Sequence, residues 1–186
     1  MKNAAVIFAN GCEEGEALTI VDILRRCEID CRMVALDDIH VTGAHGIEMI
    51  CDEVLEESLD TDVIILPGGY EGVDNMKESS LLKDILKKRN ENNQLIAAIC
   101  AAPAVLDAAG ILEGRTWTCY PGVADQISAG TYTAEKFVID GSLLTAKGPA
   151  MAWAFAYKIA DLLGADSLSV KKRMVYFNAF DVKEDE

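Results

Sequence analysis

The sequence predicts an α/β protein with a mostly parallel sheet that is covered by helices on both faces. Short apolar runs alternate with stretches of helical periodicity along the 186 residues. The runs are too short for helices and nearly all apolar, which is typical of strands buried on both faces. We find no linker, repeat or low-complexity segment, so we expect a single domain over 1–186 that is long enough to bury a sizeable core.

In the first half of the chain the pattern runs from strand to helix to strand. In order, we expect a strand at 4–9, a helix at 16–27, a strand at 31–36, a hairpin with arms at 41–42 and 47–51, and a strand at 63–66. The helix carries apolar residues on one face from Ala17 to Leu24. The hairpin turns at Gly43–Gly46, and Pro67-Gly68-Gly69 ends the last strand.

The second half continues the alternation. We expect a helix at 80–90, a strand at 94–99, a helix at 101–109, a strand at 117–120, a hairpin with arms at 137–139 and 143–146, and a helix at 148–163. Ser79 can cap the first of these helices, and Pro103 fits near the start of the second. Asp140-Gly141 is a hairpin turn signal. We expect the last residues, Asp181–Glu186, to be frayed.

Cys100 stands where the apolar run Gln94–Ile99 passes directly into the helical stretch Ala101–Ala109. This corner places its thiol on a nucleophile elbow above the carboxyl edge of the sheet, where ligands of open α/β folds bind. Crowding there predicts a sparsely populated φ/ψ region for Cys100. The helix N-terminus favours thiolate, so we expect the thiol pKa to lie well below its free value. The alternative is a buried structural cysteine.

Two loops should converge on this elbow, because loops after neighbouring strands of such a sheet share one crevice. In the loop at 67–70, Gly68 and Gly69 let the backbone approach a ligand, and the N–H groups of Gly69 and Ala101 can form an oxyanion hole. A plain turn is the alternative. In the loop at 11–16, a buried Glu16 would have a raised pKa and could shuttle a proton beside Cys100, or it could simply cap the helix.

Charge and cysteine usage exclude several function classes. The chain has 31 acidic and 17 basic residues, and the net charge of -14 disfavours nucleic acid and anionic membranes as partners. Ala4–Ala9 is too short to span a bilayer and follows no basic segment, so we expect a cytoplasmic protein without signal peptide or membrane segment. The six cysteines lack zinc-like spacing, and no phosphate-loop pattern occurs. We therefore expect no metal or other cofactor.

Four segments resemble the ThiJ/PfpI family in order and spacing: Gly11–Ala17, Val63–Gly69, Leu95–Pro103 and Thr145–Pro149. The resemblance covers about Ala4 to Leu168 and is greatest to the branch that contains the parkinsonism-associated protein deglycase. It implies a flavodoxin-like sandwich that forms a homodimer, with a single ThiJ/PfpI-like domain.

The resemblance also implies roles for individual residues. Cys100 matches the reactive cysteine of the family, Glu16 the acid that touches it, and Gly69 and Ala101 the oxyanion-hole positions. Activities in the family include cofactor-independent glyoxalase, deglycation of early glycation adducts and oxidative-stress sensing, with peptidase or chaperone work in other branches. A fold alone does not choose among them.

One position departs from the family pattern. In many relatives a histidine precedes the proline at the position of Pro121, after the strand that follows the elbow helix. This chain has Tyr120 there. A tyrosine can donate a hydrogen bond but is a poor base at neutral pH. His40 and His45 are the only histidines, and we expect both to be exposed at the first hairpin. A cysteine peptidase or amidase is therefore less favoured.

The leading hypothesis is a cysteine-dependent enzyme that acts on reactive carbonyls, either free or as glycated adducts, through Cys100 and Glu16. The alternative is a redox sensor or chaperone-like stress protein that uses oxidation of Cys100 to sulfinate. Cys12 and Cys119 could border the crevice, and a role as resolving thiol stays open for both.

Overall fold

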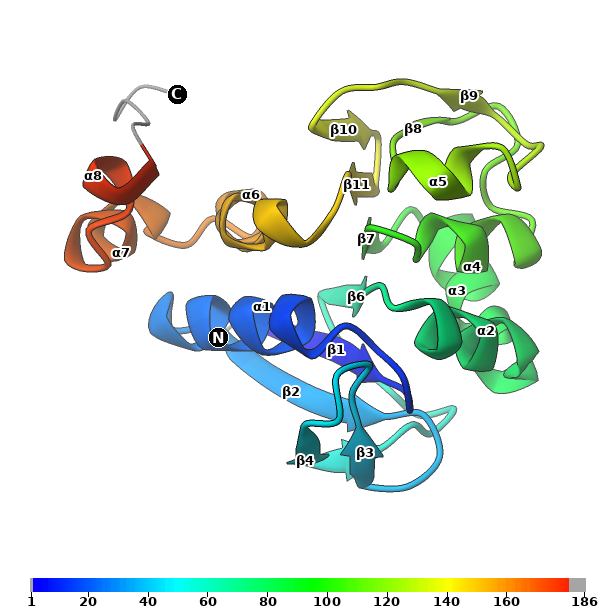
Figure 1. Cartoon of the computed structure of the whole chain (residues 1–186), viewed down its shortest axis with the longest axis horizontal. Coiled ribbons are helices and arrows are strands. Elements are labelled where there is room, and N and C mark those ends of the chain that lie inside the picture. Colours follow the sequence, from blue (N-terminus) through cyan, green and yellow to red (C-terminus); the bar gives the residue numbers. More distant parts are fainter. Residues whose placement is uncertain (1, 181–186) are drawn as a thin grey trace.

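The protein is described by a computed structural model over residues 2–180, and the predicted fraying at Asp181–Glu186 lies outside that range. A seven-stranded sheet of order β10-β11-β7-β6-β1-β2-β5 runs through its centre (Figure 1). Its strands are β1 (Asn3–Phe8), β2 (Asp30–Ala35), β5 (Glu53–Val54), β6 (Val63–Leu66), β7 (Leu95–Ile99), β10 (Phe137–Asp140) and β11 (Leu143–Ala146). Only the β10–β11 pair is antiparallel, which confirms the predicted mostly parallel sheet.

Helices cover both faces of this sheet. On one face α1 (Glu14–Arg26) packs against α6 (Ala152–Leu162), and on the other lie α2 (Tyr70–Glu78), α3 (Ser80–Glu91) and α4 (Pro103–Ala108) (Figure 1). The remaining helical segments are α5 (Pro121–Ala124), the 3₁₀ turn Pro149–Met151, α7 (Ser167–Arg173) and α8 (Tyr176–Phe180). Within 2–180, none of the helices has the length and apolar character needed to span a membrane.

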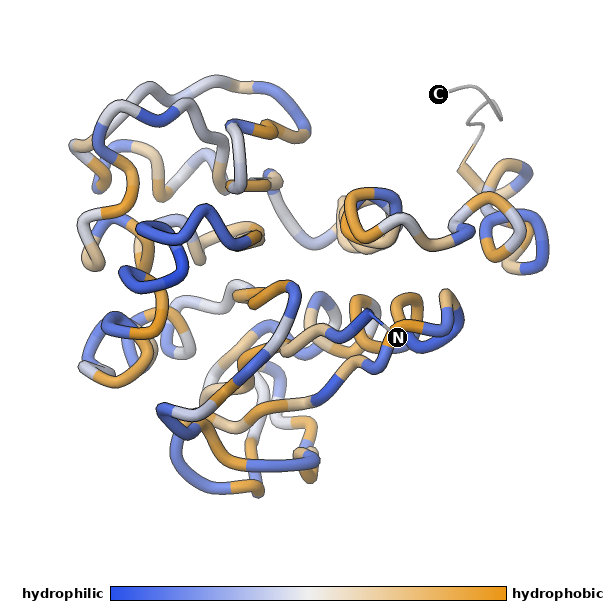
Figure 2. Tube along the Cα trace, turned by 180° about the vertical axis from the view of Figure 1, so that it is seen from behind, coloured by the Kyte–Doolittle hydropathy of each residue, from blue (hydrophilic) through white to orange (hydrophobic). Residues whose placement is uncertain are grey.

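Burial explains why these segments form strands and helices. The last five residues of β1 and all of β6 are buried, as expected for central strands covered on both faces. Along α1 hydrophobic and hydrophilic residues alternate with the turns (Figure 2), so one face packs inward. Acidic residues occupy the first turn of α1 and basic residues its last turn, which suits the helix dipole.

The sheet topology explains where a site can form. From β1 the chain continues to β2 on one side, while β6, β7 and β11 add on the other. The strand order therefore reverses beside β1, and the loops that follow β1, β6 and β7 meet at the carboxyl edge there.

Some elements differ from those expected. The expected strand at 117–120 is only β8 (Thr116–Trp117), which pairs with β9 (Thr131–Tyr132) in a separate small sheet. It ends early because the Thr118 N–H donates to the Thr145 hydroxyl and the Tyr120 N–H to the Cys100 carbonyl. The helices α2, α5, α7 and α8 and the short strands β5 and β9 were not expected from the sequence. The first hairpin, β3 (His40–Thr42) with β4 (Glu48–Ile50), is confirmed.

A buried arginine joins α3 to two central strands. The Arg89 guanidinium donates to the carbonyls of Thr61 at 2.8 Å, Asp62 at 3.0 Å and Leu95 at 2.9 Å. These carbonyls lie at the starts of β6 and β7. Burial lowers the pKa of Arg89, but its three carbonyl partners compensate for the lost hydration.

We predict that Arg89→Met destabilises the protein by about 2–4 kcal/mol, because three carbonyls lose a charged donor at once. Urea unfolding measures the change. Lys88→Met, at the exposed neighbouring position, is the matched control and should change stability little. Equal effects of the two substitutions would contradict the role assigned to Arg89.

Candidate active site

Cys100 occupies the predicted elbow between β7 and α4. Its φ of 62° lies in the left-handed region, which non-glycine residues rarely adopt, so the prediction of unusual backbone geometry is confirmed. The Cys100 N–H donates to the Ala146 carbonyl on β11 at 3.0 Å, and its carbonyl accepts from the Tyr120 N–H at 2.8 Å. Backbone contacts on two sides therefore fix the elbow.

Glu16 lies in the first turn of α1 and is fully buried beside this elbow. Its Oε2 accepts a hydrogen bond of 2.6 Å from the Gly68 N–H. Its Oε1 has no conventional hydrogen-bond partner in residues 2–180, and the carboxyl interacts with the Cys100 thiol. A Cβ added at Gly68 would lie 2.7 Å from Cβ of Cys100 and 2.9 Å from Oε2 of Glu16, so only glycine fits between them.

Burial and mutual interaction shift the pKa of both groups upward. Burial raises the pKa of Glu16 to about 7, although hydrogen bonds from Gly68 and Cys100 oppose the shift. Burial also raises the pKa of the Cys100 thiol, and the charge of Glu16 and their hydrogen bond raise it further. The Ala101 N–H acts in the opposite direction but is outweighed.

The expected low pKa of Cys100 is therefore wrong. The expectation counted the helix N-terminus, but α4 has only six residues and begins three positions after Cys100. Desolvation and the adjacent carboxylate dominate over so small a dipole. When Glu16 is ionised the thiol keeps its proton, so the two groups act as a proton-sharing pair.

Backbone contacts place the glycine loop against the first loop. Gly69 has a φ of 91°, and a Cβ there would collide with the Gly11 carbonyl oxygen. The Glu13 N–H donates to the Gly68 carbonyl at 2.9 Å. Within 2–180 the Gly69 N–H has no acceptor, whereas the Gly68 N–H is already occupied by Glu16.

A cavity of about 260 Å³ opens onto Cys100. It is lined by Glu13, Ala44, His45, Gly69, Tyr70, Cys100, Ala101, Tyr120 and Pro149. Cys100, Gly69, Ala101 and Tyr120 are thus brought together, with Glu16 and Gly68 directly behind Cys100. Sequence reasoning missed Ala44, His45 and Pro149 as lining residues. A signal for His45 was its place between two glycines in a turn that the fold could bring near the first loop.

The other cysteines lie away from this cavity wall. Cys12 and Cys119 are fully buried, and burial raises their pKa to about 12 and about 11 respectively. Neither lines the cavity, so its geometry lends no support to a resolving role. Cys27, Cys31 and Cys51 are also buried with raised pKa values, as expected for inert core thiols.

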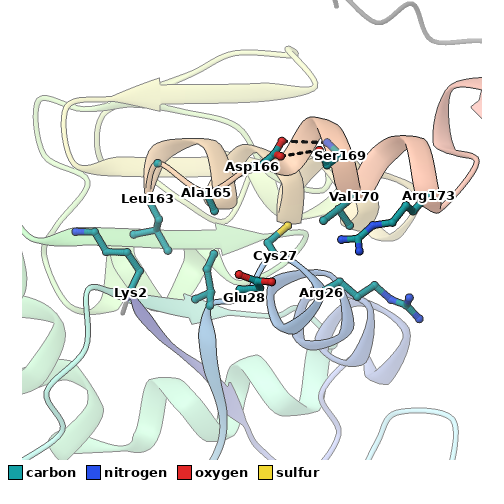
Figure 3. Close-up of a pocket in the computed structure, with 12 residues that line it drawn as sticks. Lys2, Arg26, Cys27, Glu28, Leu163, Ala165, Asp166, Ser169, Val170 and Arg173 are labelled. Atoms are coloured by element: carbon teal, nitrogen blue, oxygen red, sulfur yellow. Dashed lines mark hydrogen bonds between the residues drawn. The ribbon is translucent and has the colours of Figure 1, made fainter.

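A second cavity, of about 340 Å³, lies at the opposite, amino edge of the sheet (Figure 3). Cys27 is its only cysteine, and burial raises the pKa of that thiol to about 11. Asp166 there caps α7 through Ser169, so its carboxylate is engaged. Without a paired acid and nucleophile, this cavity lacks the features of the Cys100 site.

One group of ligand-type side chains borders the Cys100 cavity. Within the described residues, Glu13, Glu14 and His45 have side-chain atoms within 4.8 Å of one another. Glu14 and His45 already hydrogen bond to each other. We therefore treat this group as hydrogen-bonding residues and not as metal ligands.

Comparison with known proteins shows the family and the fold of the chain. A model of the DJ-1/PfpI family matches residues 2–162. The chain is 40% identical to Protein dj-1beta of Drosophila melanogaster over 167 residues, which cover 87% of this chain and 89% of that protein. It is 34% identical to the glutathione-independent glyoxalase DJR-1.2 of Caenorhabditis elegans over 167 residues, again 87% and 89% of the two chains.

The fold agrees as well. The crystal structure of Drosophila melanogaster DJ-1beta superposes with a TM-score of 0.90 at 37% identity, covering 94% of this chain and 97% of that chain. The sheet and helices of both are arranged in the same flavodoxin-like sandwich, as the resemblance in sequence implied. The chain therefore belongs to the DJ-1/PfpI family.

Proposed function

We propose that the protein is a cysteine-dependent, cofactor-independent glyoxalase that converts α-oxoaldehydes such as methylglyoxal to α-hydroxy acids. The observation that carries the proposal is the buried Glu16 carboxyl, with one oxygen lacking a conventional partner, against Cys100 at the wall of a small cavity. The similarity to a relative named a glutathione-independent glyoxalase supports it. Early glycation adducts of the same carbonyls fit the same chemistry.

The first step follows from the shared proton. Because the pKa of Cys100 is raised, the thiol attacks while Glu16 takes its proton, rather than as a thiolate formed in advance. The sulfur adds to the aldehyde carbon, and the oxyanion that forms meets the N–H groups of Gly69 and Ala101. Glu16 then passes the thiol proton to this oxygen, which gives the hemithioacetal hydroxyl and leaves Glu16 as the carboxylate that the next step needs.

The second step moves hydrogen between adjacent carbons. Glu16 removes the hydrogen of the captured carbon and returns it to the neighbouring one, which leaves a thioester on Cys100. Water then releases the α-hydroxy acid and restores the thiol. A pKa of about 7 suits Glu16 to both directions of this transfer at neutral pH.

A redox sensor is the second candidate. The same Oε1 of Glu16, when protonated, could donate a hydrogen bond to a sulfinate on Cys100. The 9% exposure of Cys100 gives a small oxidant access to the sulfur. Peptidase work is less supported, since Tyr120 offers no strong base beside the elbow.

We predict that purified protein forms lactate from methylglyoxal without glutathione. Cys100→Ser should abolish turnover. Glu16→Gln should lower turnover by about 10²–10⁴-fold and should also slow formation of the aldehyde adduct on Cys100, because Glu16 takes the thiol proton during attack. Lactate assay and intact-protein mass spectrometry measure the two effects.

Cys119→Ser is the matched cysteine control and should retain activity, because Cys119 does not line the cavity. Equal turnover by the wild type and Cys100→Ser would refute the enzymatic proposal. An inactive wild type in which peroxide converts Cys100 selectively to sulfinate would instead support the sensor.

A second prediction concerns stability and pH. The pKa of Glu16 rises from 4.5 to about 7 on folding, so the folded state favours the neutral carboxyl and loses that stability as pH rises through about 7. Glu16→Gln should therefore be about 1–3 kcal/mol more stable than the wild type at about pH 8, with a smaller difference at about pH 5. Denaturant unfolding at both pH values tests this, with Glu13→Gln as control. A difference that does not change with pH would contradict it.

We also infer a homodimer, as the family resemblance implies. Exposed apolar residues lie on α1 and on the first hairpin, among them Leu18, Ile47 and Ile50. Light scattering should return twice the chain mass of 20.1 kDa. Ile50→Lys should shift the protein toward monomer, whereas Ile139→Lys, at another exposed isoleucine on the outer strand β10, should not. A monomer mass for the wild type would refute the inference.

A further inference from the structure

The turn between β3 and β4 is folded against the active-site loops. The Gly11 N–H donates to the Thr42 carbonyl and the Ala44 N–H to the Cys12 carbonyl, both at 2.8 Å. The loop that leads from β1 into Glu16 thus also holds this turn. A turn fixed by backbone hydrogen bonds can present a side chain to the cavity in one position.

His45 is the side chain that this turn presents. The backbone N–H of His45 donates to Oε1 of Glu14 at 2.8 Å, and the ring nitrogen Nδ1 lies 3.2 Å from Oε2 of the same carboxylate. The Glu14 side chain is 3% exposed, so a buried and fixed group holds the ring. A Cβ at Gly43 would lie 2.6 Å from Cδ of Glu14, so the turn needs glycine to approach so closely. With Nδ1 occupied, Nε2 is the ring nitrogen left for a ligand.

Neighbouring carboxylates favour a protonated imidazole. The hydrogen bond with Glu14, then the charges of Glu13 and Glu14, raise the pKa of His45. Burial would raise the pKa of Glu14, but hydrogen bonds from N–H groups and from His45 outweigh it and lower that pKa. Both shifts favour an imidazolium on an ionised carboxylate, which can donate a proton or a hydrogen bond.

His45 and Cys100 line the same cavity from different loops. No hydrogen bond joins them in residues 2–180, and the proton partner of the thiol is Glu16. The histidine is thus placed to act on a bound substrate and not on the sulfur. At 68% side-chain exposure it stays accessible to a small molecule that enters the cavity.

We propose that His45 is a further catalytic residue, which contacts the oxygen on the carbon next to the one that Cys100 attacks, with Glu14 as its positioning residue. This inference rests on the proposed glyoxalase function. It gives a structural reason why α-oxoaldehydes would be preferred over simple aldehydes, which lack the second oxygen that His45 would bind.

The proton balance of the reaction requires such a group. When Glu16 removes the hydrogen of the captured carbon, its electron pair forms a double bond to the neighbouring carbon, whose oxygen takes a proton from His45. Glu16 then returns the hydrogen to that neighbouring carbon, and the hydroxyl of the captured carbon gives its proton to His45 as the thioester forms. Both residues regain their starting states, and no oxidant or reductant is consumed.

The test compares the wild type with His45→Gln and His45→Phe in buffer with EDTA, so that adventitious metal plays no part. We expect kcat for methylglyoxal to fall by about 10–10²-fold in His45→Gln, which keeps an N–H donor, and further in His45→Phe, with KM changed less. His40→Phe is the matched control, because His40 is exposed on β3 outside the cavity, and should match the wild type. Alkylation of Cys100 by iodoacetamide and the adduct with methylglyoxal should persist in every variant.

The outcomes separate the two proposals. If His45→Phe turns over methylglyoxal like the wild type while Cys100→Ser is inactive, the role of His45 is refuted and the glyoxalase stands. If the wild type shows no turnover, both are refuted. If the His45 variants slow alkylation of Cys100 as much as turnover, His45 acts on the thiol or the fold, and the proposed contact with substrate is overturned.

Discussion

One buried carboxylate organises the carboxyl edge of the sheet. Glu16 joins α1 to the β6–α2 loop through the Gly68 N–H at 2.6 Å, and it lies against the Cys100 thiol. An ionisable group removed from water must find partners or change its protonation state. Glu16 has partners and also a raised pKa. The loops after β1, β6 and β7 must therefore keep one arrangement around it. The glycine at 68 is a condition for that arrangement, since a side chain would separate acid from sulfur.

Magnitudes decide which effect controls the thiol. The dipole of a helix stabilises a charge at its terminus by about 0.3–1 kcal/mol, and the effect is smaller for a helix as short as α4. For the thiol, burial is the largest cause of the raised pKa and the charge of Glu16 the next, and the hydrogen bond from the Ala101 N–H lowers the pKa by less. Burial and the nearby carboxylate therefore override the dipole. The Cys100 thiol and the Glu16 carboxyl therefore share a proton, and the sulfur is not a free thiolate.

Local sequence signals predicted the central strands and the elbow, because each follows from a short run of residues and the parallel topology. For Glu16 they left helix capping open, and the family resemblance singled it out as the acid beside Cys100. Tertiary contacts set what they missed. The turn at 43–46 docks through hydrogen bonds to Gly11 and Cys12, far away in the sequence. The strand after Thr116 stops because Thr118 finds the Thr145 hydroxyl. The thiol pKa depends on burial by the whole fold, which no single segment encodes.

The placement of Tyr120 and His45 fits the proposed carbonyl chemistry. The Tyr120 N–H donates to the Cys100 carbonyl, which fixes position 120 at the elbow, while His45 lines the same cavity from a turn held by Glu14. Acyl transfer to a peptide needs a base for the thiol and an acid for the leaving amine. Isomerisation of a captured α-oxoaldehyde needs its acid one carbon further from the sulfur. A histidine without a hydrogen bond to the thiol in residues 2–180, together with an acid beside the thiol, meets the second requirement better than the first.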